Sequence, residues 1–511
     1  MLSRDPQGAP PTPSQVHQPL TKADVRNIFF GLMLGMFLSA VNQTIVATAL
    51  PTIGRDLGSV ESLSWVIISY LLASTVVSPL YGKLSDIYGR RSTMLVALGL
   101  FIAGSVLSAA AHDMATLIAG RTLQGIGGGG IVPLTQTTIA DMITPRERGR
   151  YQAYIGTSWI AAGVAGPALG GILAEHLHWS VIFWFNVPLG LAAALLTSRA
   201  MKRLPRHDRA HRLDIIGASL MIAAATLFLI ALTSGGTRYA WTSSIILMLL
   251  GLSLAFAIAL AWWLKRAPEP FLPLDVMRNR VMRAGTAATS CTLGAVLGLT
   301  VYMPLYFQVT HGLSASEAGF ALIPIVVMTT PGSMLSGRSM MYLRHYKVSA
   351  VAGATIAILG VSALVLWPAM PLKGVIAVLT FIGFGAGTIY PISTVSIQNA
   401  VARHQVGTAT GAMNFFRALA STLAVAIMGA ILLSGLGAVP ERGGGVELLV
   451  AAATQAGIDM AAVFRWIFVA ADIFLGLSLV GILLMEERPL LGPAAATTAP
   501  ASSEPAPAPA E

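Results

Sequence analysis

The sequence predicts an all-α polytopic membrane protein built from two related bundles of six membrane-spanning helices, with two further helices between them. Hydrophobic residues make up 55% of the 511 positions and charged residues only 11%, whereas soluble proteins carry about 25% charged residues. Apolar stretches of the roughly 20 residues that a bilayer requires recur along the chain, and one glycine-rich stretch occurs twice. This composition leaves no room for a large soluble domain.

Fourteen stretches are long and apolar enough to span a bilayer. We place them at 27–50, 63–81, 92–111, 115–138, 151–174, 179–198, 215–234, 242–264, 284–309, 318–337, 349–368, 374–398, 407–435 and 466–485. An even number of spans puts both termini on one side of the membrane.

The distribution of Lys and Arg gives the orientation, because cytoplasmic loops carry the excess of these residues. With a cytoplasmic N-terminus, cytoplasmic segments hold 25 of the 32, outer loops hold five, and Arg121 and Arg417 remain inside spans. Topology and the anionic inner leaflet thus explain the net charge of +10, and no nucleic-acid partner is expected.

The glycine-rich stretch reveals an internal repeat. GIGGGGIVPLTQTTI (125–139) aligns with GFGAGTIYPISTVSI (383–397) at an offset of 258, which also relates Gly149 to Gly407. We therefore expect an N-terminal six-helix bundle over 27–198, a cytoplasmic linker with two additional helices over 199–283, and a C-terminal six-helix bundle over 284–485. Residues 1–26 and 486–511 are predicted to be disordered cytoplasmic tails. The loop 436–465 should hold a flexible turn and a short interfacial helix.

Four motifs resemble those of the major facilitator superfamily, in its fourteen-span drug:proton antiporter subfamily. They are VNQTIVATALP (41–51), GKLSDIYGRR (82–91), LIAGRTLQGIGGGG (117–130) and AGVAGPALGG (162–171), and the resemblance covers roughly residues 27–485. It implies the major facilitator fold, with the two bundles related by a pseudo-twofold axis. It also implies a secondary active exporter of amphipathic drugs or other lipophilic small molecules, driven by the proton gradient through alternating access in the bacterial inner membrane. A dedicated exporter or importer of a specific metabolite is the alternative on the same fold.

The loop after the second span is predicted to be a cytoplasmic gate. Its glycines permit a tight turn, its aspartate can accept from helix N–H groups, and the resemblance implies a charged latch that holds the outward-facing state; a merely topogenic basic loop is the alternative. The residues are Gly82, Asp86, Gly89, Arg90 and Arg91. The corresponding stretch 337–347 has no acid, so the latch should be asymmetric.

The fifth span carries the glycine-proline motif that the resemblance associates with antiporters, at Gly166, Pro167, Gly170 and Gly171. The proline should bend the helix and the glycines should let a second helix pack closely. An ordinary proline kink is the alternative. The second half has Ala424, Val425 and Met428 instead.

We expect spans 1, 4, 9 and 12 to line a central cavity, helped by spans 2, 5, 10 and 13. The polar candidates there are Asn42, Gln43, Thr44, Arg121, Gln124, Tyr302, Tyr306, Tyr390, Ser393, Asn414 and Arg417. A cavity with apolar walls and few polar side chains is suited to amphipathic compounds. The two arginines favour anionic or neutral compounds. Packing filler is the alternative role for each tyrosine.

Proton coupling has few candidates. Relatives usually carry aspartate where this chain has Asn42, which cannot titrate. Asp472 is the acid placed within a span, and a structural partner for it is the alternative role. Arg121 stays charged, so it cannot carry the proton, but it can tune the proton affinity of a carboxylate. The other coupling candidates are Asp86, Asp141 and the charge of the substrate itself.

Cofactors, metals and disulfides are not expected. The chain has one cysteine, Cys291, no Cys/His grouping with metal-ligand spacing, and no phosphate-binding loop of nucleotide-driven pumps. It also has no nucleophile with a neighbouring base, so an enzyme is not expected. The expected partners are the lipid bilayer, a small-molecule substrate and protons. We expect a monomer, and a periplasmic adaptor is left open.

Overall fold

The computed structural model describes residues 21–58, 62–203, 213–236, 238–435 and 459–490, and these are overwhelmingly helical. The α-helices are α1 (Lys22–Leu57), α2 (Leu63–Tyr88), α3 (Arg90–Ala109), α4 (Met114–Met142), α5 (Pro145–His176), α6 (Val181–Trp184), α7 (Asn186–Ala200), α8 (Ile215–Ser234), α9 (Ser244–Leu264), α10 (Leu274–Arg278), α11 (Arg280–His311), α12 (Ala315–Ala321), α13 (Ile323–Val327), α14 (Thr329–Tyr342), α15 (Lys347–Leu366), α16 (Leu372–Asn399), α17 (Val406–Gly435) and α19 (Met460–Leu484). The predicted all-α membrane fold is confirmed.

Thirteen helical segments of the described chain are long and apolar enough to cross a membrane. The fourteenth predicted span is α4, which is 29 residues long but less apolar, because glycines, Arg121 and two glutamines occupy positions that other spans give to aliphatic residues. Two spans are interrupted: α6 and α7 form one of them, and α12, α13 and α14 form another that contains Pro324 and Pro331. Proline removes a helix hydrogen bond and bends the axis.

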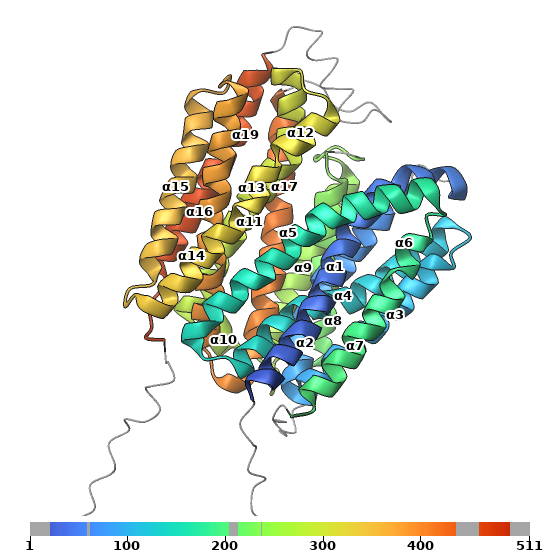
Figure 1. Ribbon diagram of the computed structural model, residues 1–511, viewed down its shortest axis with the longest axis vertical. Coiled ribbons are helices and arrows are strands. Elements are labelled where there is room, and N and C mark those ends of the chain that lie inside the picture. The colour runs from blue at the N-terminus through green and yellow to red at the C-terminus, as the bar shows by residue number, and fades with distance from the viewer. Residues whose placement is uncertain (1–20, 59–61, 204–212, 237, 436–458, 491–511) are drawn as a thin grey trace, which may run out of the picture.

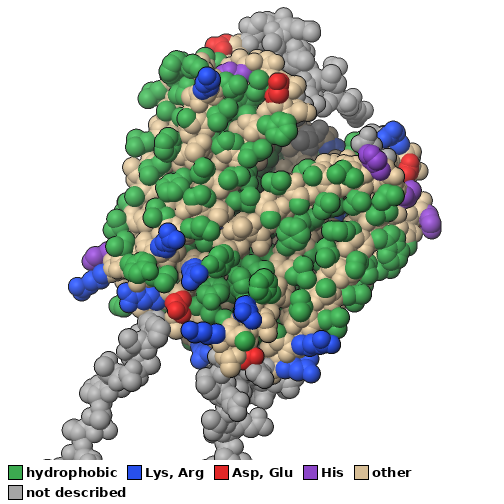
Figure 2. All heavy atoms as spheres, in the orientation of Figure 1, with side chains coloured by type: hydrophobic (Ala, Val, Ile, Leu, Met, Phe, Trp, Pro, Cys, Tyr) green, Lys and Arg blue, Asp and Glu red, His purple; other side chains and the backbone are tan. Residues whose placement is uncertain are grey.

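The helices form two lobes that meet at one end and part at the other (Figure 1). Helices α1 to α7 pack mainly on one another, as do α11 to α19, while α8 and α9 pair with each other and α8 also packs on α2 and α17. We call the end at which α1 starts and α19 finishes the basic end, because Lys and Arg side chains gather there (Figure 2). The other end is called the opposite end.

The sequence repeat has a counterpart in packing. A Cβ built on Gly125 or Gly129 of α4 would lie 2.5 or 2.3 Å from backbone oxygens of α2. At the equivalent positions, a Cβ on Gly383 or Gly387 of α16 would lie 2.1 Å from backbone oxygens of α13 and of Thr329 at the start of α14. These glycines therefore let corresponding helix pairs of the two bundles approach more closely than any side chain would permit.

The predicted ends of three segments need correction. Residues 22–26 are helical rather than part of a disordered tail, because Thr21 and Asp24 form a capping box that starts α1 five residues earlier than predicted. At the other end of the chain, α19 begins at Met460, so Arg465 lies on a helix and not in a loop. Residues 486–490 were also predicted to be disordered, but Glu487 accepts a hydrogen bond from the Lys347 N–H at 3.1 Å and the Arg488 carbonyl accepts one from the Tyr346 hydroxyl at 3.0 Å. The remaining tail predictions, for 1–20 and 491–511, lie outside the described residues. So do those for 436–458 and for 204–212 of the linker.

Candidate functional site: the central pathway and its closed end

The two bundles meet at the basic end through Asp86, in the last turn of α2. Its carboxylate accepts hydrogen bonds from the backbone N–H groups of Gly407 (3.2 Å) and Thr408 (2.8 Å) and from the Thr408 hydroxyl (2.7 Å). These N–H groups belong to the first turn of α17, where they have no partner within the helix and where the helix dipole attracts negative charge. Asp86 of one bundle therefore caps a helix of the other.

Arg90 holds Asp86 in place. Its guanidinium donates to Asp86 at 2.6 Å and to Asp141 of α4 at 2.8 Å, and the three side chains are at most 10% exposed. Arg91 instead donates to the carbonyl and the hydroxyl of Ser198, both at 2.9 Å, and so ties α3 to α7 within one bundle. Gly89 has φ +84°, a conformation that favours glycine, and it provides the turn between α2 and α3.

Glycine pairs bring backbones together on both seams of this closed end. A Cβ on Gly82 of α2 would lie 2.4 Å from the carbonyl oxygen of Gly407 in α17, and a Cβ on Gly337 of α14 would lie 2.6 Å from that of Gly149 in α5. Arg146 of α5 also donates to the Met341 carbonyl at 2.7 Å. Among the described residues no ion pair crosses the α5–α14 seam, so the two seams are related in shape but not in charge.

A buried amide network crosses between the bundles beyond the latch. Asn414 of α17 donates to the side-chain oxygen of Gln136 in α4 at 2.8 Å, and Gln398 of α16 donates to the Gln136 carbonyl at 3.4 Å and to Thr410 at 3.2 Å. Sequence reasoning named Asn414 but missed the two glutamines. The available signal was that both lie in polar runs, TQTT (135–138) and STVSIQN (393–399), near the ends of the repeated spans.

Arg417 lies one helical turn from Asn414 on the same face of α17, toward the opposite end. Its guanidinium donates to the Asn414 side-chain oxygen at 2.5 Å, and Tyr390 of α16 is close enough to interact with its charge. No carboxylate of the described residues lies within ion-pair distance of it. Because Asn414 reaches Gln136 of the other bundle, Arg417 beside it lies on the inter-bundle side of α17. At the opposite end the surface is hollowed between the lobes (Figure 2).

Arg121 is held inside the N-terminal bundle. It is 1% exposed, donates to the Val66 carbonyl (2.9 Å) and to Gln124 (2.6 Å), and lies 4.4 Å from the centre of the Tyr70 ring. Gln124 donates onward to Ser105 of α3 at 2.6 Å. Arg121 and Gln124 therefore connect α2, α3 and α4 and, in this conformation, do not line an open cavity.

Asn42 is fully buried and is paired with a residue that sequence reasoning missed. The Asn186 side chain, in the first turn of α7, donates to the Asn42 side-chain oxygen at 3.2 Å. The other amide atom of each residue has no partner among the described residues. Gln43, the next residue, is only partly buried.

Ser393 of α16 is also buried, with its hydroxyl unpaired among the described residues.

The glycine-proline motif of α5 packs against α1. A Cβ on Gly166 would lie 1.8 Å from the Thr44 hydroxyl oxygen, and one on Gly170 would lie 2.2 Å from that of Thr48. The Thr44 hydroxyl donates across the contact to the Ala162 carbonyl at 3.1 Å. Thr44 is thus engaged in helix packing. Gly171 has no neighbour within 4 Å of a built Cβ.

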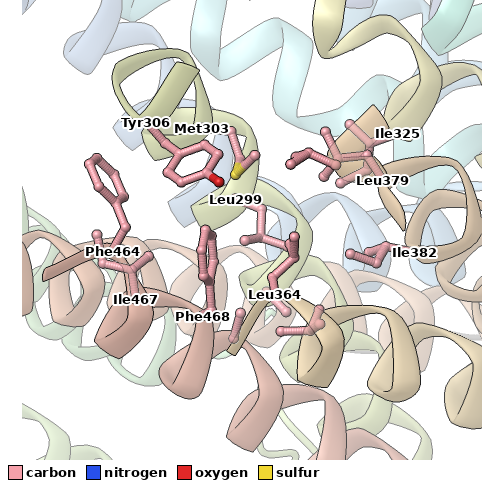
Figure 3. Close-up of a cluster of buried hydrophobic side chains, with 14 of the residues drawn as sticks. Leu299, Met303, Tyr306, Ile325, Leu364, Leu379, Ile382, Phe464, Ile467 and Phe468 are labelled. Atoms are coloured by element: carbon pink, nitrogen blue, oxygen red, sulfur yellow. The ribbon is translucent and has the colours of Figure 1, made fainter. Parts of the chain in front are cut away.

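The predicted tyrosines occupy different environments. Tyr306 is buried in the core of the C-terminal bundle against Phe464 and Phe468 of α19 (Figure 3), and its hydroxyl donates to the Pro368 carbonyl at 2.7 Å. The structure therefore places it away from the hollow, in the packing role that was the alternative. Tyr302 lines a cavity of about 290 Å³ among α2, α8, α11 and α17, and its hydroxyl donates to the Val425 carbonyl at 3.0 Å.

Asp472 lies on α19 at its contact with α15. One carboxylate oxygen accepts from the Ser362 hydroxyl at 2.8 Å, and the other is buried with no partner among the described residues. Asp472 and Arg121 belong to different bundles, so the structure does not bring these two coupling candidates together.

Two internally related bundles that close on each other at one end and part at the other define the two-bundle class of membrane transporters. The family model of the Major Facilitator Superfamily matches residues 32–425, and the chain belongs to this superfamily of transporters. It is 32% identical over 403 residues to the multidrug transporter protein MdtP of Bacillus subtilis, covering 79% of this chain and 74% of that protein.

Multidrug resistance protein 3 of the same organism is 32% identical over 415 residues, 80% of each chain. The crystal structure of the human organic anion transporter MFSD10 superposes with a TM-score of 0.62 at 17% identity, covering 90% of this chain and 99% of that one. The predicted family and fold are thereby confirmed.

Proposed function

We propose that this protein is a secondary active exporter of amphipathic or lipophilic small molecules, driven by the proton gradient across a bacterial cell membrane. The basic end is cytoplasmic, because Lys and Arg side chains collect at the cytoplasmic ends of spans. Both described ends of the chain lie at that end (Figure 1). The conformation is then outward-facing, with the pathway closed toward the cytoplasm. Export is favoured over import by the glycine-proline motif of α5 and by the multidrug and efflux names of relatives.

The observation that carries this proposal is the construction of the closed end. Its contacts join α2 to α17 and α5 to α14. The contacting faces of these four helices lie on the surfaces of two bundles that are each packed separately. The bundles can therefore part there without exposing their own cores. Helix capping by Asp86 exists only while the α2–α17 seam is shut, so it stabilises one state of a two-state element.

The substrate preference follows from the uncompensated arginine on the inter-bundle face. A cation within a membrane-spanning segment is expensive and normally paired, yet the partly buried Arg417 donates only to a neutral amide among the described residues. A carboxylate, sulfonate or phosphate on a lipophilic body supplies the missing charge. We therefore propose amphipathic anions and neutral lipophiles as substrates ahead of monocations.

Coupling is proposed to use Asp472 or the acids of the latch, Asp86 and Asp141, or to draw on the charge of the substrate itself. Moving one elementary charge across the membrane potential changes the free energy by about 2.3 kcal/mol per 100 mV. With the inside of the cell negative, the membrane potential itself drives an anion outward, so export of an anion is favourable without a protein carboxylate in the cavity.

The test is efflux of matched fluorescent lipophilic anions and cations from cells that express the wild type, Asn42→Asp or Asp472→Asn, each with and without a protonophore. We expect efflux that favours the anion and collapses with the protonophore. Loss of efflux in Asp472→Asn would assign coupling to α19. If efflux survives in Asp472→Asn and is stronger in Asn42→Asp, coupling would be assigned to position 42 in the first span. Equal transport of monocations contradicts the substrate preference, and no efflux of any compound favours a dedicated metabolite.

A further inference from the structure

A groove of about 540 Å³ lies outside the central pathway, where α8, α10, α11 and α17 come together. Its lining is apolar apart from one charged side chain and a few hydroxyl or thiol groups: Phe228, Met277, Met282, Arg283, Thr286, Ala287, Ser290, Cys291, Phe416, Leu419, Ala420 and Leu423. The volume falls in the range of sites that hold small molecules, about 300–1,000 Å³.

The groove opens sideways, toward the bilayer. Helices α8 and α11 each pack on α17 but make little contact with each other, so α17 forms the floor between two walls. All lining residues except Met277 belong to membrane-spanning helices. From Arg283 to Cys291 the α11 wall rises by about 12 Å, so the groove runs from near the basic end toward the middle of the membrane.

The groove is preformed because the segment beneath it is anchored. Asp214, at the start of α8, accepts hydrogen bonds from Gly217 N–H (2.8 Å), from the Trp263 indole (2.9 Å) and from Phe271 N–H (3.0 Å). Phe271 itself is fully buried. One carboxylate thus fixes the start of α8, the end of α9 and the chain that leads to α10.

The mouth of the groove carries positive charge. Arg283 is exposed, lines the groove, and makes no side-chain hydrogen bond or ion pair with any described residue. The neighbouring Arg278 and Arg280 are exposed as well, and the connection from α9 to α11 holds two exposed acids, Glu269 and Asp275. Basic groups at the membrane surface attract anionic lipid head groups, and basic pockets between spans bind them specifically.

We propose that this groove is a binding site for one anionic phospholipid, whose phosphate pairs with Arg283 and whose acyl chain lies along α17 between α8 and α11. A phospholipid fits both halves of the site, because it joins a negative head group at the membrane surface to a chain that extends toward the bilayer centre. The lipid fills the gap between the additional helix pair and the C-terminal bundle and so couples α8 to α17. This site is independent of the proposed transport activity.

Native mass spectrometry of the purified full-length protein tests head-group recognition, with phosphatidylglycerol and phosphatidylcholine added in equal amounts. Both lipids offer a phosphate to Arg283, but the choline cation of phosphatidylcholine cancels that charge and is repelled by the exposed arginines at the mouth. We therefore expect one retained phosphatidylglycerol at a preference of about tenfold. Arg283→Gln should abolish the preference. Arg278→Gln, an exposed arginine at the same end that does not line the groove, should keep it. Equal retention of both lipids, or loss of preference only in Arg278→Gln, overturns the proposal.

The single native cysteine tests occupancy of the groove itself, since Cys291 lies in its wall. Phosphatidylglycerol should slow alkylation of Cys291 by N-ethylmaleimide in the wild type. Ala287→Phe fills the groove and should remove the effect of lipid, whereas Ala261→Phe, on an exposed face of α9, should preserve it. Protection by a transported compound but by neither phospholipid would make the groove a substrate entrance and overturn the lipid assignment.

Discussion

Replacing Asp86 by Asn tests the latch, because the substitution keeps the size of the side chain and removes its charge. Asp86 accepts three hydrogen bonds from the first turn of α17 and pairs with Arg90. The amide oxygen of the variant can still accept from one side. The amide nitrogen is itself a donor, and it would face the N–H or O–H donors of α17 that the second carboxylate oxygen of Asp86 accepts from. These hydrogen bonds exist only when the α2–α17 seam is shut, so removing them destabilises the closed state alone.

The magnitude follows from the hydrogen bonds that the substitution removes. Hydrogen bonds to charged groups contribute about 1.5–3 kcal/mol each, and a negative charge at a partly buried helix N-terminus contributes up to about 2 kcal/mol. These terms are not additive, and Arg90 keeps its bond to Asp141. We therefore expect a shift of about 3 kcal/mol, which is roughly a hundredfold change in the ratio of closed to open basic ends.

Double electron–electron resonance measures this ratio. In a Cys291→Ser background, spin labels at Tyr88 of α2 and Tyr342 of α14, both exposed at the basic end, should report a longer distance in Asp86→Asn. Labels at Leu177 and Phe320, exposed at the opposite end, should report a shorter one.

The matched control for that experiment is Asp275→Asn, because Asp275 is an exposed acid at the start of α10 that takes no part in the latch. It should leave both distance distributions as they are in the wild type. Unchanged distributions in Asp86→Asn, in protein that folds and binds substrate, would refute the assignment of Asp86 as the residue that holds the basic end shut.

Helix packing and burial lead to three more expectations. Gly170→Leu should lower the free energy of unfolding of the purified protein by about 2–4 kcal/mol, because a Cβ at Gly170 would clash with Thr48. Gly171→Leu should not lower it, because a Cβ at Gly171 meets open space. Equal losses in the two variants would contradict the α1–α5 contact. Tyr306→Phe should cost about 1–2 kcal/mol by leaving the Pro368 carbonyl unpaired without altering efflux, and an efflux defect at normal stability would show that the tyrosine does more than pack. Arg417→Gln should reduce efflux of a lipophilic anion at least tenfold relative to a neutral compound of the same skeleton, and an equal reduction of both would remove the argument for charge recognition.

Most of the fold was predictable because the bilayer imposes it. Every backbone group within the hydrocarbon must be paired inside its own segment, so apolar length alone located the spans, and the repeat located the two halves. The hydropathy of α4 is lower than that of the other spans, since glycines that serve close packing lower it. Its alignment with α16 in the repeat supports it as a span.

The site was predictable only where local chemistry is visible in the chain. Asp86 next to Arg90 and Arg91 marked a loop with a function, but the partner that Asp86 caps lies more than 300 positions further on, at Gly407 and Thr408. Asn186 and Gln136 were missed for the same reason. An isolated amide in an apolar segment carries no sign of its partner, and its role appears only when two helices are brought together.

The two intramembrane arginines differ in the partners that surround them. Arg121 is covered by a carbonyl, an amide and an aromatic face, so its charge is distributed within one bundle and its removal should chiefly weaken that bundle. Arg417 donates to one neutral amide within the described part of the chain and lies where the bundles must separate. A charge that is incompletely paired in the resting protein is free to be paired by a ligand, and a charge on the moving interface changes its surroundings when the bundles move. Selectivity for anions and response to conformation should therefore reside together in Arg417.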